Sequence, residues 1–148
     1  MSGFTELISA MRDAAARLSP AAETLTATVA DAASTGARAG ILPVDPDRST
    51  GALADSLTPV GPETADGISR SEIGSNLVYA RIQNYGGTIV PNGHSGGGGL
   101  WLRWEAGGEV HFAKKVTLPA KHYMDEGAAD GVDSLKYAAD EFFTEVFG

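Results

Sequence analysis

The sequence predicts an α+β domain: a small antiparallel β-sheet with a long N-terminal helix, a short inserted helix and a C-terminal amphipathic helix. Apolar residues recur at helical spacing near both ends of the chain. Between them, turn signals at residues 66–67 and 106–108 each separate two segments of strand-like composition. The 148 residues fit one domain. We expect a helical segment, a linker, a sheet region and a C-terminal helix at residues 4–35, 36–50, 51–120 and 125–147 of a single unit, 1–148.

The predicted N-terminal helix carries one apolar stripe, which we interpret as core or subunit contact. Its members are Phe4, Leu7, Ile8, Met11, Ala15, Leu18, Leu25 and Val29. Pro20 interrupts the pattern, because a proline inside a helix removes a backbone hydrogen bond and clashes with the preceding turn. Two arrangements fit: one long kinked helix, or two helices that meet at Ser19. We expect Gly36 or Gly40 to end the helix.

The sheet region is predicted to begin with a hairpin after the linker. A strand at residues 56–62 contains two prolines, which cannot donate ladder hydrogen bonds, so we expect it at a sheet edge. The Asp-Gly turn returns the chain to a partner strand at residues 68–73. Because the two isoleucines of that strand have opposite parity, we expect a bulge or a strand that ends early.

A short helix is predicted next. Ser75 or Asn76 is a suitable N-cap, and Gly86 suits the residue that closes a helix. A helix of this length is unstable alone, so we expect one face to be buried. The residues of that face are Val78, Ile82 and Tyr85. A strand at residues 88–90 should follow.

Two further elements complete the prediction. A glycine-rich loop at residues 91–99, expected to be mobile until a partner orders it, precedes a hairpin of residues 100–105 and 109–113. Residues 116–119 read as the end of another strand. The C-terminal helix has apolar residues spaced 4, 3, 4, 3 and 4 apart, at Ala128, Val132, Leu135, Ala139, Phe142 and Val146, with Tyr137 and Phe143 widening this stripe.

The formal net charge of −8 is concentrated near the C-terminus. Residues 125–148 hold seven acidic residues and one basic residue. Nucleic-acid binding through phosphates requires clustered Lys and Arg, so we do not expect specific DNA binding. We interpret the acids as a solvated helix face. A second hypothesis is that they face a channel and repel passing DNA.

Composition limits the remaining classes. The chain has no cysteine, which excludes disulfides and thiolate metal sites. No apolar run approaches the roughly 18 residues that span a bilayer. The first residues lack the basic and apolar segments of a signal peptide. We therefore expect synthesis in the cytoplasm and no membrane association.

No motif predicts a catalytic residue, a cofactor or a metal. The glycines at 96–99 lead into a strand, whereas a P-loop leads through Gly-Lys-Ser/Thr into a helix. The histidines His94, His111 and His122 lie on separate predicted elements, so their spacing predicts no zinc site. Ser75 lacks the second glycine of a nucleophile elbow and is better explained as a helix cap.

Three sequence blocks stand in a distinctive order. Residues 50–57 begin Thr-Gly-Ala-Leu-Ala-Asp-Ser, residues 73–87 run from Ile-Gly-Ser-Asn to Tyr-Gly-Gly, and residues 116–120 read Val-Thr-Leu-Pro-Ala. Together they resemble three motifs of the head–tail joining (neck, or tail-completion) proteins of long-tailed double-stranded DNA bacteriophages. The third resembles the Pro-Ala-Arg-Pro-Phe-Leu strand end of that family. The resemblance spans residues 50–124, about half the chain.

The third block departs from the family pattern. Lys121 stands where the family usually has Arg, His122 where it has Pro, and Tyr-Met at residues 123–124 where Phe-Leu is usual. Lysine lacks the bidentate fork of arginine, so a carboxylate pairing at this position does not carry over.

The resemblance implies a structural virion protein without catalysis or a cofactor. It implies a homo-oligomeric ring, with six-fold symmetry the first expectation, at the head–tail interface, assembled in the host cytoplasm. Its partners would be copies of itself, the phage connector, adaptor or stopper proteins, and the tail terminator or tail tube protein, with DNA passing through the lumen. The candidate interface residues are Tyr79, Arg81, Gln83, Tyr85, Gly86, Gly87, Trp101, Trp104 and Lys121.

Other interpretations stay open. A tail terminator, which caps the tail tube, differs only in its neighbours. A small soluble enzyme with a mobile Gly-rich lid would show convergent titratable groups in a pocket. A host-derived binding module would stay monomeric. We propose Tyr85, Trp101 and Trp104 as the aromatic anchors of an interface, but these side chains could equally fill the core.

Overall fold

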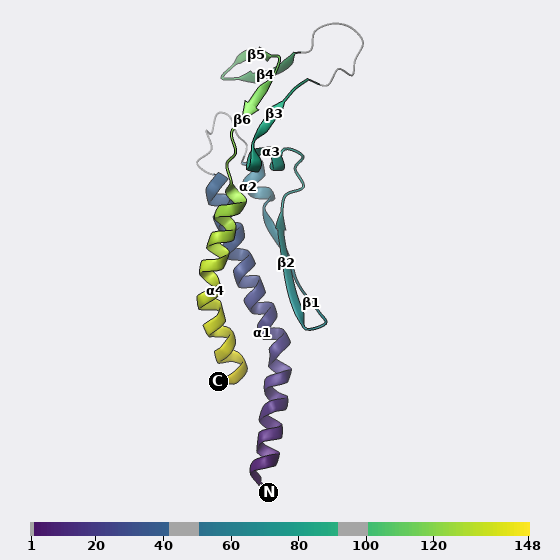
Figure 1. The fold of residues 1–148 in the computed structure, drawn as a ribbon, viewed down its shortest axis with the longest axis vertical. Coiled ribbons are helices and arrows are strands. Elements are labelled where there is room, and N and C mark those ends of the chain that lie inside the picture. The colour runs from purple at the N-terminus through teal and green to yellow at the C-terminus, as the bar shows by residue number, and fades with distance from the viewer. Residues whose placement is uncertain (1, 42–50, 92–100) are drawn as a thin grey trace.

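The computed structural model describes residues 2–41, 51–91 and 101–148. It confirms the predicted α+β fold class, with a long helix near each end of the chain (Figure 1). The strands form three antiparallel pairs, β1–β2, β3–β6 and β4–β5, instead of the one sheet that we predicted. The elements are α1 (Ser2–Ile41), α2 (Ala52–Ser56), β1 (Thr58–Ala65), β2 (Ile68–Gly74), α3 (Ala80–Tyr85), β3 (Gly87–Ile89), β4 (Leu102–Ala106), β5 (Glu109–Ala113), β6 (Val116–Leu118) and α4 (Tyr123–Phe147).

Helix α1 is one continuous helix that includes Pro20, which decides between the two arrangements that the sequence allowed. It passes through Gly36 and Gly40 and ends at Ile41, so the predicted helix end was wrong. These glycines lie where α1 meets α4: a Cβ atom at Gly36 would collide with the carboxylate of Asp130. They serve close packing instead of terminating the helix. The rest of the predicted linker, residues 42–50, lies outside the described residues.

Helices α1 and α4 lie side by side and antiparallel (Figure 1). Small residues allow their backbones to approach closely. A Cβ atom built on Gly127 would lie 2.5 Å from the carbonyl oxygen of Ala33 and 2.7 Å from the Cβ of Ala37. One built on Gly131 would lie 3.0 Å from the Cβ of Ala33. The helix pair therefore depends on glycines facing alanines.

The C-terminal helix is confirmed, but its apolar stripe is only partly buried: Val146 is buried and Phe142 is half-buried, whereas most of the buried face was not predicted. Glycine and alanine occupy much of that face, whereas Val132 is 63% exposed and Leu135 and Tyr137 are also exposed. The physical reason is the close backbone approach, which leaves no room for bulky side chains between the helices. The buried residues of α4 are Tyr123, Gly127, Gly131, Ala138 and Val146.

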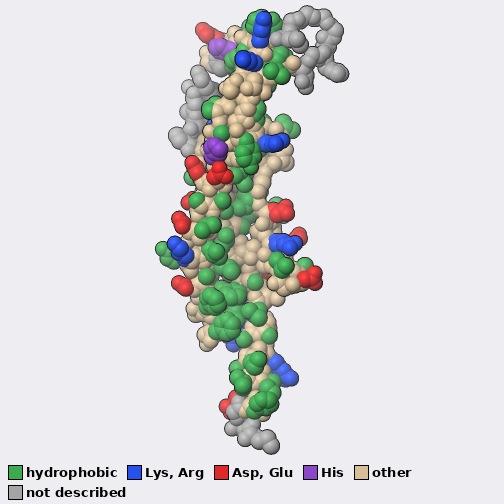
Figure 2. All heavy atoms as spheres, viewed as in Figure 1, with side chains coloured by type: hydrophobic (Ala, Val, Ile, Leu, Met, Phe, Trp, Pro, Cys, Tyr) green, Lys and Arg blue, Asp and Glu red, His purple; other side chains and the backbone are tan. Residues whose placement is uncertain are grey.

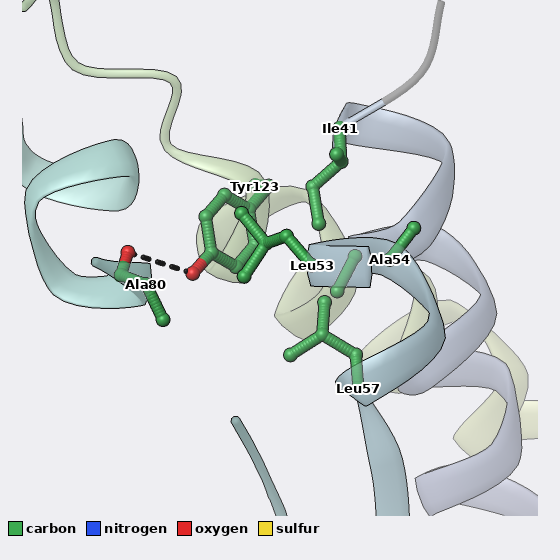
Figure 3. Packing of buried hydrophobic residues seen from close by; sticks show 7 residues of the cluster. Ile41, Leu53, Ala54, Leu57, Ala80 and Tyr123 are labelled. Atoms are coloured by element: carbon green, nitrogen blue, oxygen red, sulfur yellow. Dashed lines mark hydrogen bonds between the residues drawn. The ribbon is translucent and has the colours of Figure 1, made fainter. Parts of the chain in front are cut away.

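The main apolar core lies where the C-terminal end of α1 meets α2, α3 and the start of α4 (Figure 3). It is small, and its largest fully buried apolar side chains include Leu57. Arg38 supports this region by donating from Nε to the carbonyl oxygen of Leu57 at 2.9 Å. The labelled members in Figure 3 are Ile41, Leu53, Ala54, Leu57, Ala80 and Tyr123.

The two predicted hairpins are present. The β1–β2 hairpin lies beside α1, and its register shifts between Val60 and Glu63. The extra residue of this bulge lies in β1, whereas β2 alternates regularly, so Ile68 is exposed and Ile73 is half-buried on the other face. The β4–β5 hairpin turns through Gly107 and Gly108, which both have positive φ, as a two-residue primed turn requires. The short β3–β6 ladder lies between this hairpin and the helices (Figure 1).

The short inserted helix begins later than predicted. Helix α3 starts at Ala80, because Ser75 accepts a hydrogen bond from the Leu77 amide within a local turn. Only one residue of the predicted buried face is even half-buried, Ile82, whereas Val78 is 98% exposed and Tyr85 is exposed. Ala80 and Asn84 are buried in their place. The predicted glycine-rich loop falls almost entirely on residues 92–100, outside the described residues.

Replacing Gly127 with alanine should destabilise the fold despite alanine's higher helix propensity. The added methyl group meets the α1 backbone, and overpacking of this kind costs about 1–3 kcal/mol, against a propensity gain of about 1 kcal/mol. Urea unfolding followed by circular dichroism measures the free energy of unfolding. Gly131→Ala is the matched control, since its Cβ has more room and should cost less. A Gly127→Ala protein more stable than wild type would contradict this packing.

Candidate functional site

The three sequence blocks of the resemblance meet around α3. The hydroxyl oxygens of Ser56 and Ser75 lie 2.6 Å apart, which joins the first block to the second. The Tyr123 hydroxyl donates to the carbonyl oxygen of Ala80 at 2.9 Å, which joins the second block to the third (Figure 3). Thr50 of the first block lies outside the described residues.

Asn84 holds the start of α4. Its side-chain oxygen Oδ1 accepts a hydrogen bond from the Met124 amide at 3.0 Å, and its backbone carbonyl accepts one from the His122 amide at 3.0 Å. The N-cap residue of α4, His122, makes no side-chain cap hydrogen bond. Asn84 thus caps α4 from a different helix, and its burial at 2% exposure keeps water from competing.

Gly86 and Gly87 allow the chain to pass tightly against the third block. Gly86 has φ of 70°, and a Cβ there would lie 2.7 Å from the Ala120 amide nitrogen. Gly87 pairs with Leu118 in the β3–β6 ladder. The Tyr-Gly-Gly motif therefore has a structural explanation here: only residues without a side chain fit between α3 and residues 118–120.

His122 adopts a backbone conformation that is closed to proline. Its φ of 53° lies in the left-handed region, which proline cannot adopt because its ring fixes φ near −65°. The backbone at this position therefore differs from that of a chain with proline. The imidazole Nδ1 lies 3.1 Å from a carboxylate oxygen of Asp125 in the first turn of α4.

Tyr123 is buried at the centre of the junction. Burial, and then the charge that Tyr85 acquires on ionisation, raise the pKa of the Tyr123 hydroxyl above its usual value. The hydroxyl therefore stays protonated and keeps donating to Ala80. Its role is to connect α3 and α4.

Seven of the nine predicted interface residues lie at or next to α3. Tyr79, Arg81, Tyr85 and Lys121 are exposed, and their side chains are available to a neighbour. The others, Gln83, Gly86 and Gly87, take part in the packing of this junction; the Gln83 carbonyl accepts a hydrogen bond from the Lys121 amide at 3.1 Å. These residues surround one rigidly packed junction.

Trp101 and Trp104 lie elsewhere, at the β4–β5 hairpin beyond the β3–β6 ladder (Figure 1). Both are at least two-fifths exposed, so they do not fill the core. The Trp104 ring stacks on His111 with centroids 5.4 Å apart, and the Lys114 ammonium lies 5.3 Å from the centroid of the Trp101 ring. The structure does not bring these tryptophans together with the residues around α3.

The long helices expose a surface that the predicted interface residues did not include. Figure 2 shows hydrophobic side chains gathered along α1 and α4. Two exposed sets contribute: an α1 stripe of Phe4, Leu7, Met11 and Leu18, and an α4 stripe of Val132, Leu135, Phe143 and Phe147. Between the helices, a groove of about 300 Å³ is lined by Val29, Ala33, Ile73, Val132 and Leu135 among others. The sequence signal for this surface was present, since the apolar stripes were read as core or subunit contact.

Among the described residues, no three side chains of His, Asp or Glu lie close enough together to bind a metal ion. Nor does any helix within this part of the chain have the length and apolar character needed to span a membrane. His94, one of the three histidines considered, falls outside the described ranges.

Comparison of the chain with protein-family models, curated proteins and solved structures finds no match in any of the three.

Replacing Asn84 with alanine should destabilise the junction. Alanine removes the oxygen that accepts the Met124 amide hydrogen bond and leaves that buried donor without a partner. We therefore expect the free energy of unfolding to fall by about 1–2 kcal/mol. Thermal and urea unfolding measure this change. Asn76→Ala, at an exposed position outside the helices, is the matched control and should change stability by less than about 0.5 kcal/mol. Equal effects of the two substitutions would show that Asn84 does not cap α4.

Proposed function

We propose that this chain is a structural virion protein that forms a homo-oligomeric ring at the head–tail interface of a long-tailed bacteriophage. In this position it joins the head connector, adaptor or stopper proteins to the tail terminator or tail tube protein. DNA passes through the lumen without specific binding. Six-fold symmetry is the first expectation for the ring.

The observation that carries an assembly function is the exposed apolar surface of α1 and α4. Met11 is 65% exposed and Phe143 is 58% exposed. The contact between their two helices is made largely by glycine and alanine. Apolar surfaces of this extent mark sites of protein–protein contact. A subunit of an assembly has a physical reason for this surface, since its neighbours cover it.

The phage assignment rests on the resemblance, and the geometry around α3 supports it. Hydrogen bonds join the first block to the second and the second to the third, across up to 43 positions in sequence. The acidic α4, with seven acids and one lysine, suits a protein beside which DNA must pass without adhering. A tail terminator is the nearest alternative. The two roles differ in the defect that loss of the protein causes: unjoined heads and tails for a neck protein, tails of uncontrolled length for a terminator.

Particles produced by the parent phage without this gene should accumulate as separate, DNA-filled heads and complete tails. Negative-stain electron microscopy of the lysate distinguishes the outcomes, and complementation with the wild-type gene is the control. Tails of uncontrolled length would indicate a terminator instead. Intact, infectious virions would remove the proposal.

A further inference from the structure

We infer that the N-terminal arm of α1, residues 2–16, docks on the α4 stripe of a second copy of this chain. The inference rests on the proposed ring and specifies the contact that joins adjacent subunits. It concerns a surface separate from the residues around α3.

The arm projects beyond the rest of the helix pair. Arg17 Nη1 donates to the carbonyl oxygen of Glu145 at 3.3 Å, so the last turns of α4 lie beside Arg17. The preceding residues continue past the end of α4 (Figure 1). At a rise of about 1.5 Å per residue, the arm extends about 22 Å.

The arm presents an apolar stripe along its length. Phe4 and Met11 are 71% and 65% exposed, and Leu7 lies between them on the same side of the helix. A helix of this length is marginally stable in water unless an apolar face packs against a partner. The arm thus requires a surface of matching length and character.

The α4 stripe offers such a surface. Val132, Leu135, Phe143 and Phe147 are exposed along residues 132–147, a span of about 24 Å. The lengths of the arm and of this stripe agree. Figure 2 shows hydrophobic side chains over both segments on the same face of the molecule.

Within one chain, the two kinds of stripe already border the same groove. Further along α1, Val29 and Ala33 belong to the same helical stripe as the arm residues, and they line the groove with Val132 and Leu135. The α1 stripe therefore already lies next to this side of α4. A neighbour's arm would continue that packing across the exposed part of α4.

Charge favours an arm over a second α4 as the occupant. Helix α4 has seven acids and one lysine, so pairing two α4 stripes face to face would place like charges together. The arm carries only Glu6, Arg12 and Asp13. An arm on a neighbour's α4 is a head-to-tail contact, and repetition of such a contact closes a ring when the rotation permits.

The absence of cysteine allows a direct test. Full-length Met11→Cys protein is mixed with full-length Val132→Cys, Leu135→Cys or Phe143→Cys protein under mild oxidation, with one subunit carrying a size tag. We expect mixed disulfide dimers between Met11→Cys and at least one of the α4 variants. Tyr137→Cys, 78% exposed and about 140° around the helix from Val132, is the control and should cross-link much less.

Each other outcome overturns the inference. Disulfides only between identical α4 variants would indicate α4–α4 pairing, and disulfides only between Met11→Cys subunits would indicate paired arms. Cross-linking to Tyr137→Cys at an equal rate would indicate random collision. A wild-type chain that remains monomeric in sedimentation at the concentrations used would also overturn it.

A charge substitution provides an independent measurement. Met11→Glu should weaken self-association at least about ten-fold, because docking would bury an unpaired carboxylate. Ser9→Glu adds the same charge on the opposite side of the arm and should leave association unchanged. Equal association of both variants and wild type would overturn the docking.

The outcomes separate the two proposals. Rings that form without arm cross-links would contradict only the arm contact, and the virion role would stand. Arm cross-links in a protein whose loss leaves virions intact would contradict the virion role and leave the contact established.

Discussion

The close approach of α1 and α4 at Gly127 and Gly131 is the constraint on which the rest of the structure depends. With glycines facing Ala33 and Ala37, the helix backbones nearly touch, and no bulky residue fits between them. Two consequences follow. The helix pair gains its stability from many close contacts between small groups. Many of the large apolar side chains of both helices lie on the outside, where they form the surface that we assign to neighbouring subunits.

The junction around α3 is the second constraint. It depends on the packing of α1 against α4, because the start of α4 must be in place before α3 can contact it. Asn84 caps α4, Tyr123 reaches back to Ala80, and Gly86 permits close passage of residues 118–120. This arrangement gives the three sequence blocks a shared physical role: they build one rigid base. Tyr79, Arg81 and Tyr85 extend outward from that base, where a partner can reach them.

The sequence predicted most of the elements and several details, but it missed α2, because residues 52–56 were assigned to the sheet region. The hairpin at Gly107 and the helix near each end follow from local chemistry, which is readable without tertiary information. The buried face of α4 was not predictable in the same way, because glycine reads locally as a helix-weakening residue. The spacing of Gly127 and Gly131 opposite small residues was the available signal. Asn84 was missed because capping from another helix leaves no local pattern.

The same helix pairing has a consequence for how the chain folds. The β1–β2 and β4–β5 hairpins join neighbouring residues and can form locally, whereas α1 finds its partner only across more than 80 intervening positions. During synthesis, the glycine- and alanine-rich side of α1 therefore stays uncovered until α4 emerges from the ribosome. Completion of the monomer is a late event, and α1 spends the interval accessible to chaperones or to premature association.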